Sequence, residues 1–198
     1  MPYFTNCSQN GIVAHNGSQI RVTQPYYFNN ISNVAISLNS SSQLRADGIS
    51  SISGSSLSMN QVYTGVRMAN ASAEISNAKI EACQFGVVST KNSSFSFDDS
   101  YITGKGNLAI ASYGIYNDGN SVGTAYGTVL AAFITGPTSG TGAMYKNING
   151  AILFVSDITS ASAANTIGLF TSYVVADPTR GNYANVADVN QEEVPYKP

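Results

Sequence analysis

The amino-acid sequence predicts an all-β protein built as a parallel β-helix, a solenoid of about seven stacked coils. Three observations predict this fold class. Apolar residues do not keep helical spacing, because Gly, Asn and Ser interrupt every long stretch. A short phrase recurs at intervals of roughly 20 to 30 residues, which is typical of solenoids. Patches of Asn and Ser follow several of these phrases and suit corners, since such residues tolerate left-handed backbone angles.

Each recurring phrase joins a small residue to an aliphatic one. The clear and weaker examples are Gly11-Ile12, Ala35-Ile36, Gly65-Val66, Gly86-Val87, Gly114-Ile115, Ala143-Met144 and Thr166-Ile167. Stacked coils align equivalent residues, so we expect the second residue of each phrase to lie in one buried column. Asn16, Asn70 and Asn92 follow such phrases, and we expect them to form a ladder of amides near one corner.

Stretches that alternate apolar and polar residues follow the Asn and Ser patches. Leu44 and Ala46 stand two residues apart, as do Phe95 and Phe97, so each pair faces one side of a strand. We expect short strands with one buried face. A β-sandwich is the alternative, because it also has many short strands separated by turns.

The phrases divide the chain into three parts. Residues 1–10 form an N-terminal lead-in, and residues 11–176 form the parallel β-helix. Residues 177–198 lose the alternation and gather Pro, Asn and acidic residues. We expect this tail to cap the last coil or to lie along a neighbouring chain, since an uncovered end is an open sheet edge.

Composition excludes several classes of partner. Only 10% of residues are charged, the formal net charge is −2 and the basic residues are scattered, so nucleic acid is not an expected partner. The sequence has no apolar run of the roughly 20 residues that a membrane helix requires, and its first ten residues lack the basic and apolar regions of a signal peptide, so we expect no export signal. Cys7 and Cys83 lack the spacing of a metal or redox motif. We expect two separate thiols, no metal site, no cofactor and no membrane insertion.

The Gly-Ile and Gly-Val starts at Gly11, Gly65, Gly86 and Gly114, the Asn and Ser corners and the low charge resemble those of one protein group. The chain is similar, over residues 11–176, to the right-handed parallel β-helix of the pectate-lyase-like group, especially the tailspike and tail fibre proteins of bacteriophages. The resemblance implies a homotrimer of rods on the virion tail that grips or cuts host-surface polysaccharide. It rests on no diagnostic motif and therefore transfers no catalytic residue.

Three carboxylates are candidates for hydrolysis of a polysaccharide. Glycoside hydrolases use two carboxyl groups roughly 5 Å apart, or 6.5 to 9.5 Å apart, depending on the stereochemical outcome. Asp47 and Asp98 occupy equivalent positions two coils apart, which places them roughly 10 Å from one another. Glu74 lies on the coil between them. Acidic corner residues on a solvated surface are the alternative.

Aromatic residues are the candidates for sugar binding. Sugars present apolar CH faces that stack on rings, while Asn, Ser and Asp bind their hydroxyl groups. Tyr26, Tyr27, Tyr113 and Tyr116 lie in or beside expected strands. Tyr26 and Tyr27 are adjacent, so on a strand they face opposite sides, and one of them should point outward.

These features favour a structural and receptor-binding module of a phage tail spike or fibre over an enzyme. Such a module contacts host-surface glycan as a homotrimer and is located in the virion. A polysaccharide depolymerase, either a glycoside hydrolase or a lyase, is an alternative on the same fold. A cell-surface or extracellular adhesin is the other alternative, because the rigid repeated surface serves attachment in either setting.

Overall fold

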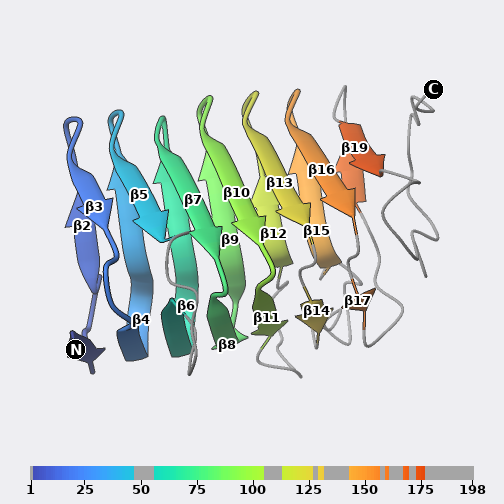
Figure 1. The fold of residues 1–198 in the computed structure, drawn as a ribbon. Coiled ribbons are helices and arrows are strands. Elements are labelled where there is room, and N and C mark those ends of the chain that lie inside the picture. The colour runs from blue at the N-terminus through green and yellow to red at the C-terminus, as the bar shows by residue number, and fades with distance from the viewer. Residues whose placement is uncertain are drawn as a thin grey trace.

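The computed structural model describes residues 2–46, 56–104, 113–126, 129–131, 143–156, 159–160, 167–169 and 173–176. These residues form an all-β structure in which strands lie side by side along one direction (Figure 1). The described part of the chain contains no helix, and hence none long and apolar enough to cross a membrane. The predicted all-β class is confirmed.

The strands are short except for two that exceed twelve residues. In chain order they are β1 (Tyr3–Thr5), β2 (Ile12–Ala14), β3 (Gln19–Arg21), β4 (Tyr26–Asn39), β5 (Gln43–Ala46), β6 (Leu57–Ala69), β7 (Ser72–Ser76), β8 (Lys79–Cys83), β9 (Phe85–Thr90), β10 (Ser94–Asp98), β11 (Tyr101–Gly104), β12 (Tyr113–Asn117), β13 (Val122–Tyr126), β14 (Val129–Ala131), β15 (Ala143–Ile148), β16 (Ile152–Ser156), β17 (Thr159–Ser160), β18 (Ile167–Leu169) and β19 (Tyr173–Ala176).

The strands form two sheets. The 12-stranded sheet has the order β17-β14-β11-β8-β6-β9-β12-β15-β18, with β4 beside β6 and both β1 and β2 beside β4. The 7-stranded sheet has the order β19-β16-β13-β10-β7-β5-β3. Every described strand pair is parallel. A β-sandwich is made of antiparallel sheets, so that alternative is wrong.

The two long strands, β4 and β6, connect two rows of short strands within the larger sheet. Their mutual register shifts between Ile31 and Val34. The first part of β6 then pairs with β8, and the second part pairs with β9. Along the chain, a strand of the smaller sheet alternates with one strand from each of these two rows.

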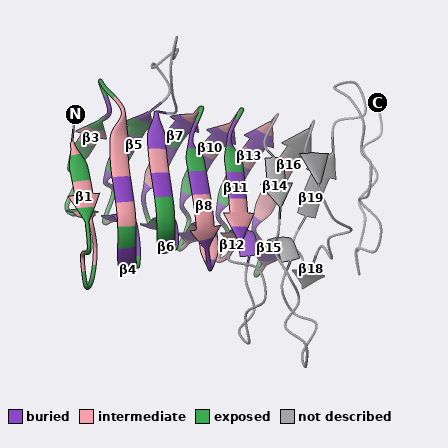
Figure 2. Cartoon of the chain, turned by 90° about the horizontal axis from the view of Figure 1, so that it is seen from below, coloured by how far each residue is buried: buried purple, intermediate pink, exposed green. Residues whose placement is uncertain are grey.

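A buried column of aliphatic residues runs through the larger sheet. Ile12 pairs with Ile36, and the register continues through Val66, Val87 and Ile115. Four of the five are fully buried, whereas Ile12 on the terminal strand is partly exposed. Buried and exposed positions alternate along many strands (Figure 2). The first five members of the expected column are confirmed.

The expected continuation of this column through Met144 and Ile167 is wrong by one residue. Ile115 pairs with Tyr145, and Ile167 pairs with Lys146. A shift of one residue moves every side chain of a strand to its other face, so the register matters for the surface as well as the core. Ala143, Met144 and Tyr145 are consecutive apolar residues, and their pattern therefore fits either register.

Close approach between neighbouring strands explains why the recurring phrases begin with glycine. A Cβ atom on Gly65 would lie 2.6 Å from the carbonyl oxygen of Gly86. A Cβ atom on Gly86 would lie 2.5 Å from the carbonyl oxygen of Gly114 and 2.5 Å from Cγ2 of Ile102. These distances leave no room for a side chain, so the small residue is a packing requirement.

Left-handed backbone angles mark the corners that the Asn and Ser patches predict. Positive φ angles occur at Asn16, Gly17, Ser40, Ser41, Asn70, Lys91, Asn92, Gly119, Asn120, Asn149 and Gly150. The amide pairs that the structure describes lie elsewhere than the expected ladder of Asn16, Asn70 and Asn92. They join Asn6 to Asn30, Asn29 to Asn60, and Asn117 to Asn147.

Of the two terminal parts expected from the sequence, the structure describes most of the N-terminal lead-in and none of the tail. Residues Tyr3–Thr5, within the expected lead-in, form β1 and pair with β4. The expected tail, residues 177–198, lies outside the described residues. Cys7 and Cys83 are both free thiols, as expected.

Candidate functional site

A row of aromatic rings crosses three neighbouring strands of the larger sheet. Tyr63 of β6 meets Phe85 of β9 edge-on at 5.6 Å between ring centroids. Phe85 stacks on Tyr113 of β12 at 5.9 Å, and Tyr113 meets Tyr116 edge-on at 5.8 Å. We call Tyr63, Phe85, Tyr113 and Tyr116 the aromatic row. Offset and edge-on rings at these distances attract one another beyond simple burial.

The aromatic row is partly open to solvent. Tyr63 is 38% exposed, Phe85 and Tyr116 are half-buried, and Tyr113 is 6% exposed. Tyr113 is therefore the buried member of the row, and the other three rings are partly exposed to water. Half-exposed rings on a rigid sheet are suited to stacking against the CH face of a sugar.

Lys146 of β15 places its ammonium group over two of these rings. Its Nζ atom lies 5.3 Å from the centroid of Tyr113 and 5.4 Å from that of Tyr116. The strand register explains the contact, because Lys146 is directly opposite Tyr116. Contacts between a cation and ring faces at this range are worth about 0.5–1 kcal/mol at exposed sites. The row therefore carries a fixed positive charge at one end.

The environment of Tyr116 makes its phenol harder to ionise. Burial raises the pKa of Tyr116 above its ordinary value of 10.0, and the nearby charge of Asp118 and the Tyr113 phenol raise it further. Asp118 accepts a hydrogen bond from the side-chain amide of Asn149 at 2.7 Å. At neutral pH Tyr116 is thus a neutral hydroxyl that can donate or accept a hydrogen bond.

The structure separates the four predicted tyrosines into two groups. Tyr113 and Tyr116 belong to the aromatic row, whereas Tyr26 and Tyr27 lie near the N-terminal end of the stack on β4. Tyr26 packs against the core, while Tyr27 stacks on the exposed ring of Tyr3 at 6.2 Å. The expectation that these adjacent tyrosines face opposite sides is confirmed.

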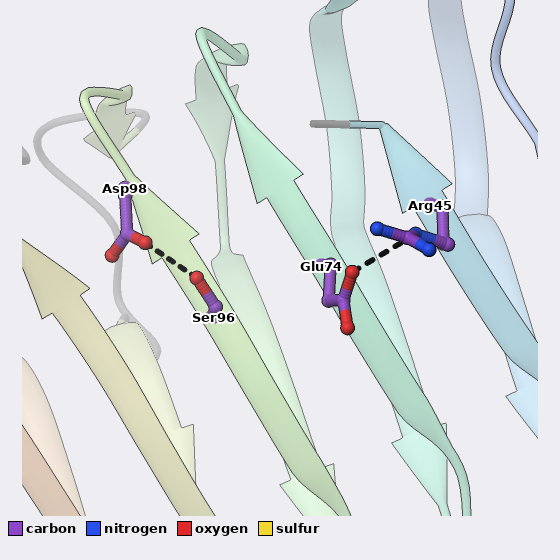
Figure 3. A network of polar contacts seen from close by, with 4 residues as sticks. All are labelled: Arg45, Glu74, Ser96 and Asp98. Atoms are coloured by element: carbon purple, nitrogen blue, oxygen red, sulfur yellow. Dashed lines mark hydrogen bonds and ion pairs between the residues drawn. The ribbon is translucent and has the colours of Figure 1, made fainter. Parts of the chain in front are cut away.

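The candidate acid Glu74 forms an ion pair with Arg45 on the outer face of the smaller sheet. The two residues are opposite one another on β7 and β5, with 2.9 Å between Nε of Arg45 and Oε2 of Glu74 (Figure 3). The side chains are 59% and 55% exposed, so the pair adds little stability. Asp47 lies outside the described residues.

The candidate acid Asp98 is held by hydrogen bonds within its own surroundings. The Ser96 hydroxyl donates to Oδ2 of Asp98 (Figure 3). The backbone N–H of Tyr126 donates to Oδ1 of Asp98 at 3.1 Å. Glu74 is opposite Ser96, so Asp98 lies one strand away and two residues further along. Both carboxylates therefore face outward on adjacent strands, but each already has partners of its own.

The part of the chain that the structure describes contains no cluster of metal-binding side chains. The described acids that the sequence singled out, Glu74 and Asp98, have an arginine and hydrogen-bond donors as partners. An ion-pair and hydrogen-bond network of this type fixes the outer face of a sheet. The aromatic row is the more distinctive surface, because three partly exposed rings and a cation gather there around the buried ring of Tyr113.

Sequence reasoning missed three members of this surface, namely Tyr63, Phe85 and Lys146. A signal for the aromatic row was present, because Phe85 and Tyr113 each stand directly before the glycine of a recurring phrase. Extending the phrase by one residue towards the N-terminus would have aligned them. Lys146 had no such signal, since its contact depends on the register between β12 and β15.

Comparison with known proteins adds no further information. No family model, no curated protein and no solved structure matches the chain.

Proposed function

We propose that the chain is a structural and receptor-binding module that folds as a parallel β-helix and contacts host-surface polysaccharide. The strand order supports the β-helix. Each turn of the chain adds one strand to the smaller sheet and one strand to each of the two rows of the larger sheet. The next turn then lies one strand spacing further along the stack. A chain that winds in this manner places its loops at corners, where the left-handed residues occur.

The aromatic row with Lys146 is the observation that carries the binding role. The rings come from three adjacent strands, and the centroids of neighbouring rings lie 5.6 to 5.9 Å apart. The ammonium group of Lys146 lies over the ring of Tyr113. Parallel in-register strands hold these rings rigidly, so little conformational entropy is lost when a ligand binds. A rigid, ring-lined and partly polar surface fits a carbohydrate chain.

Attachment rather than cleavage is the role we favour. Glu74 and Asp98 already have partners, and a hydrolase needs one carboxyl group available to donate a proton and another available to act as base or nucleophile. A phage tail spike or fibre, assembled as a homotrimer on the virion, is the setting that the sequence resemblance implies. An adhesin on a cell surface would use the same surface in the same way.

Binding to an array of bacterial capsular and O-antigen polysaccharides tests this function. We expect one or a few glycans to bind, and Tyr116→Ala to weaken that binding about tenfold through the loss of a stacking ring. Tyr101→Ala is the matched control, because Tyr101 is 37% exposed and lies on β11, away from the row. Equal losses from the two variants would contradict a site at the aromatic row.

Release of reducing ends from the bound glycan separates attachment from cleavage. We expect no turnover during prolonged incubation. Turnover that Asp98→Asn abolishes would show that the chain is a depolymerase and that the attachment role is wrong.

A further inference from the structure

A second row of residues lies in register on the outer face of the larger sheet. Arg67 is opposite Val88, Val88 is opposite Tyr116, and Tyr116 is opposite Lys146. Each of the first three directly follows a member of the buried column, so its side chain points to the other face. Arg67 is exposed, and the other three are half-buried. We call Arg67, Val88, Tyr116 and Lys146 the cationic row.

The two cations stand at opposite ends of this row. Three strand steps separate Arg67 from Lys146, which corresponds to roughly 14 Å at the usual strand spacing. Val88 and Tyr116 fill the space between them with an apolar side chain and a ring. The row therefore presents positive, apolar, aromatic and positive groups in sequence along the stack.

Neither cation of the row has a carboxylate partner among the described residues. Other cations of the chain do have partners, since Arg45 pairs with Glu74 and Lys79 pairs with Glu81 at 2.9 Å each. Lys146 rests on the rings of Tyr113 and Tyr116 instead. Asp118 contributes a negative charge near Tyr116, where it is hydrogen-bonded by Asn149. Arg67 and Lys146 are therefore available to acidic groups of a ligand.

We propose that the cationic row binds an anionic polysaccharide, with one acidic group at Arg67, another at Lys146 and a sugar ring stacked on Tyr116. This inference rests on the proposed function and names the class of glycan. The guanidinium of Arg67 offers a planar pair of donors that matches a carboxylate or a sulfate, whereas the Lys146 ammonium acts as a point charge. A glycan that runs along the stack meets both cations and the ring.

The chemistry of the row fits uronic acids and sulfate esters equally well, so the test includes both. Binding of wild-type protein is measured by calorimetry with oligogalacturonate, which carries carboxylates, with dextran sulfate oligosaccharides and with neutral dextran oligosaccharides. We expect the acidic probes to bind at least about tenfold more tightly than neutral dextran, with affinity that falls as salt rises. The better acidic probe identifies the anionic group.

Charge-removing variants locate the binding. We expect Arg67→Gln and Lys146→Gln each to weaken binding of the better acidic probe about fivefold, and to weaken binding of neutral dextran by a smaller factor. Arg21→Gln is the matched control, because Arg21 is also exposed but lies on β3 of the smaller sheet. Unchanged circular dichroism spectra show that each variant folds, so that a loss of affinity reports on contact.

Four outcomes would contradict this inference or the function on which it rests. Equal affinity for acidic and neutral probes would overturn the acidic ligand and leave glycan binding intact. Equal losses from Arg21→Gln and Lys146→Gln would overturn the location of the site at the cationic row. Binding of single-stranded DNA as tight as that of the acidic glycans would show a general anion surface. Failure to bind every probe, together with an empty glycan array, would overturn the proposed function itself.

Discussion

At the scale of single residues, glycine and asparagine decide where the chain packs closely and where it turns. Gly65 and Gly86 lie against the backbone of the next strand, where no side chain fits. Asn16 and Asn92 adopt positive φ angles at the corners. A Cβ atom would meet the neighbouring backbone at the first kind of position, and Asn and Gly tolerate the left-handed angles of the second kind better than most residues do.

The close approach at Gly86 predicts a loss of stability on substitution. Gly86→Ala should lower the free energy of unfolding by about 1–3 kcal/mol, because the new methyl group meets the Gly114 carbonyl oxygen and Ile102. Urea denaturation followed by circular dichroism measures the change. Gly17→Ala is the comparison, since Gly17 has open space around it and a φ of 75°. It should cost only about 1 kcal/mol from backbone strain. Equal losses would contradict the packing explanation.

The raised pKa of Tyr116 predicts a dependence of stability on alkaline pH. Folded protein holds the phenol proton more tightly than unfolded protein does, so this contribution is complete below pH 10.0 and is lost as the pH rises through the folded pKa. Tyr116→Phe should therefore lose less stability than wild type as the pH rises above 10.0. Denaturant midpoints over this range measure the difference, and parallel curves would show that Tyr116 does not contribute.

At the scale of elements, neighbouring strands are joined by paired side-chain amides as well as backbone bonds. Asn117 of β12 donates to Oδ1 of Asn147 on β15 at 2.9 Å, and both residues are fully buried. Asn147 in turn donates to the carbonyl oxygen of Ala151 at 2.7 Å. A buried polar group that loses its partner keeps its desolvation cost, so this pair fixes β12 and β15 relative to one another.

Removal of one amide from the buried pair tests that role. Asn147→Ala should lower the free energy of unfolding by about 1–3 kcal/mol, since it leaves the Asn117 amide with one partner fewer. The matched control is Asn60→Ala, which breaks the exposed pair of Asn60 and Asn29 and should change stability by less than about 0.5 kcal/mol. Similar losses in denaturant titrations would show that burial does not matter here.

The sequence predicted correctly those strands whose apolar pattern fits only one register. Gly-Ile and Gly-Val phrases align Val66, Val87 and Ile115 correctly, because the aliphatic residue that follows each glycine faces the core. The apolar run around Met144 fits two registers, and the sequence prediction of Met144 as the partner of Ile115 was wrong. Half of the aromatic row was predicted from residue type. Lys146 and Arg67 were not, since their positions beside Tyr116 depend on strand order and register.

At the scale of the whole molecule, the described strands stack in parallel rows. The sheets keep a parallel register across successive strands (Figure 1). The outer face can therefore hold a ligand or a second chain along many strands at once. The homotrimer implied by the sequence resemblance would use such extended faces.

Molar mass in solution tests the trimer. Light scattering on the purified chain should give about three times the mass of 20.7 kDa, with no dependence on concentration in the micromolar range. The three copies should remain associated in high salt, because few charged residues are available to join them. A monomeric mass would contradict the tail-spike arrangement.

The in-register column of Ile36, Val66 and Val87 also determines how such a chain can change its length. Excision of residues 66–86 joins Gly65 to Val87, which recreates the same two-residue phrase and leaves Ile36 with an equivalent neighbour. Excision of a single residue within a strand would instead move the later side chains of that strand out of the column. Removal or addition of one coil therefore changes the length of the stack by one strand spacing, about 4.8 Å. We expect related chains to differ in length by the duplication or loss of whole coils.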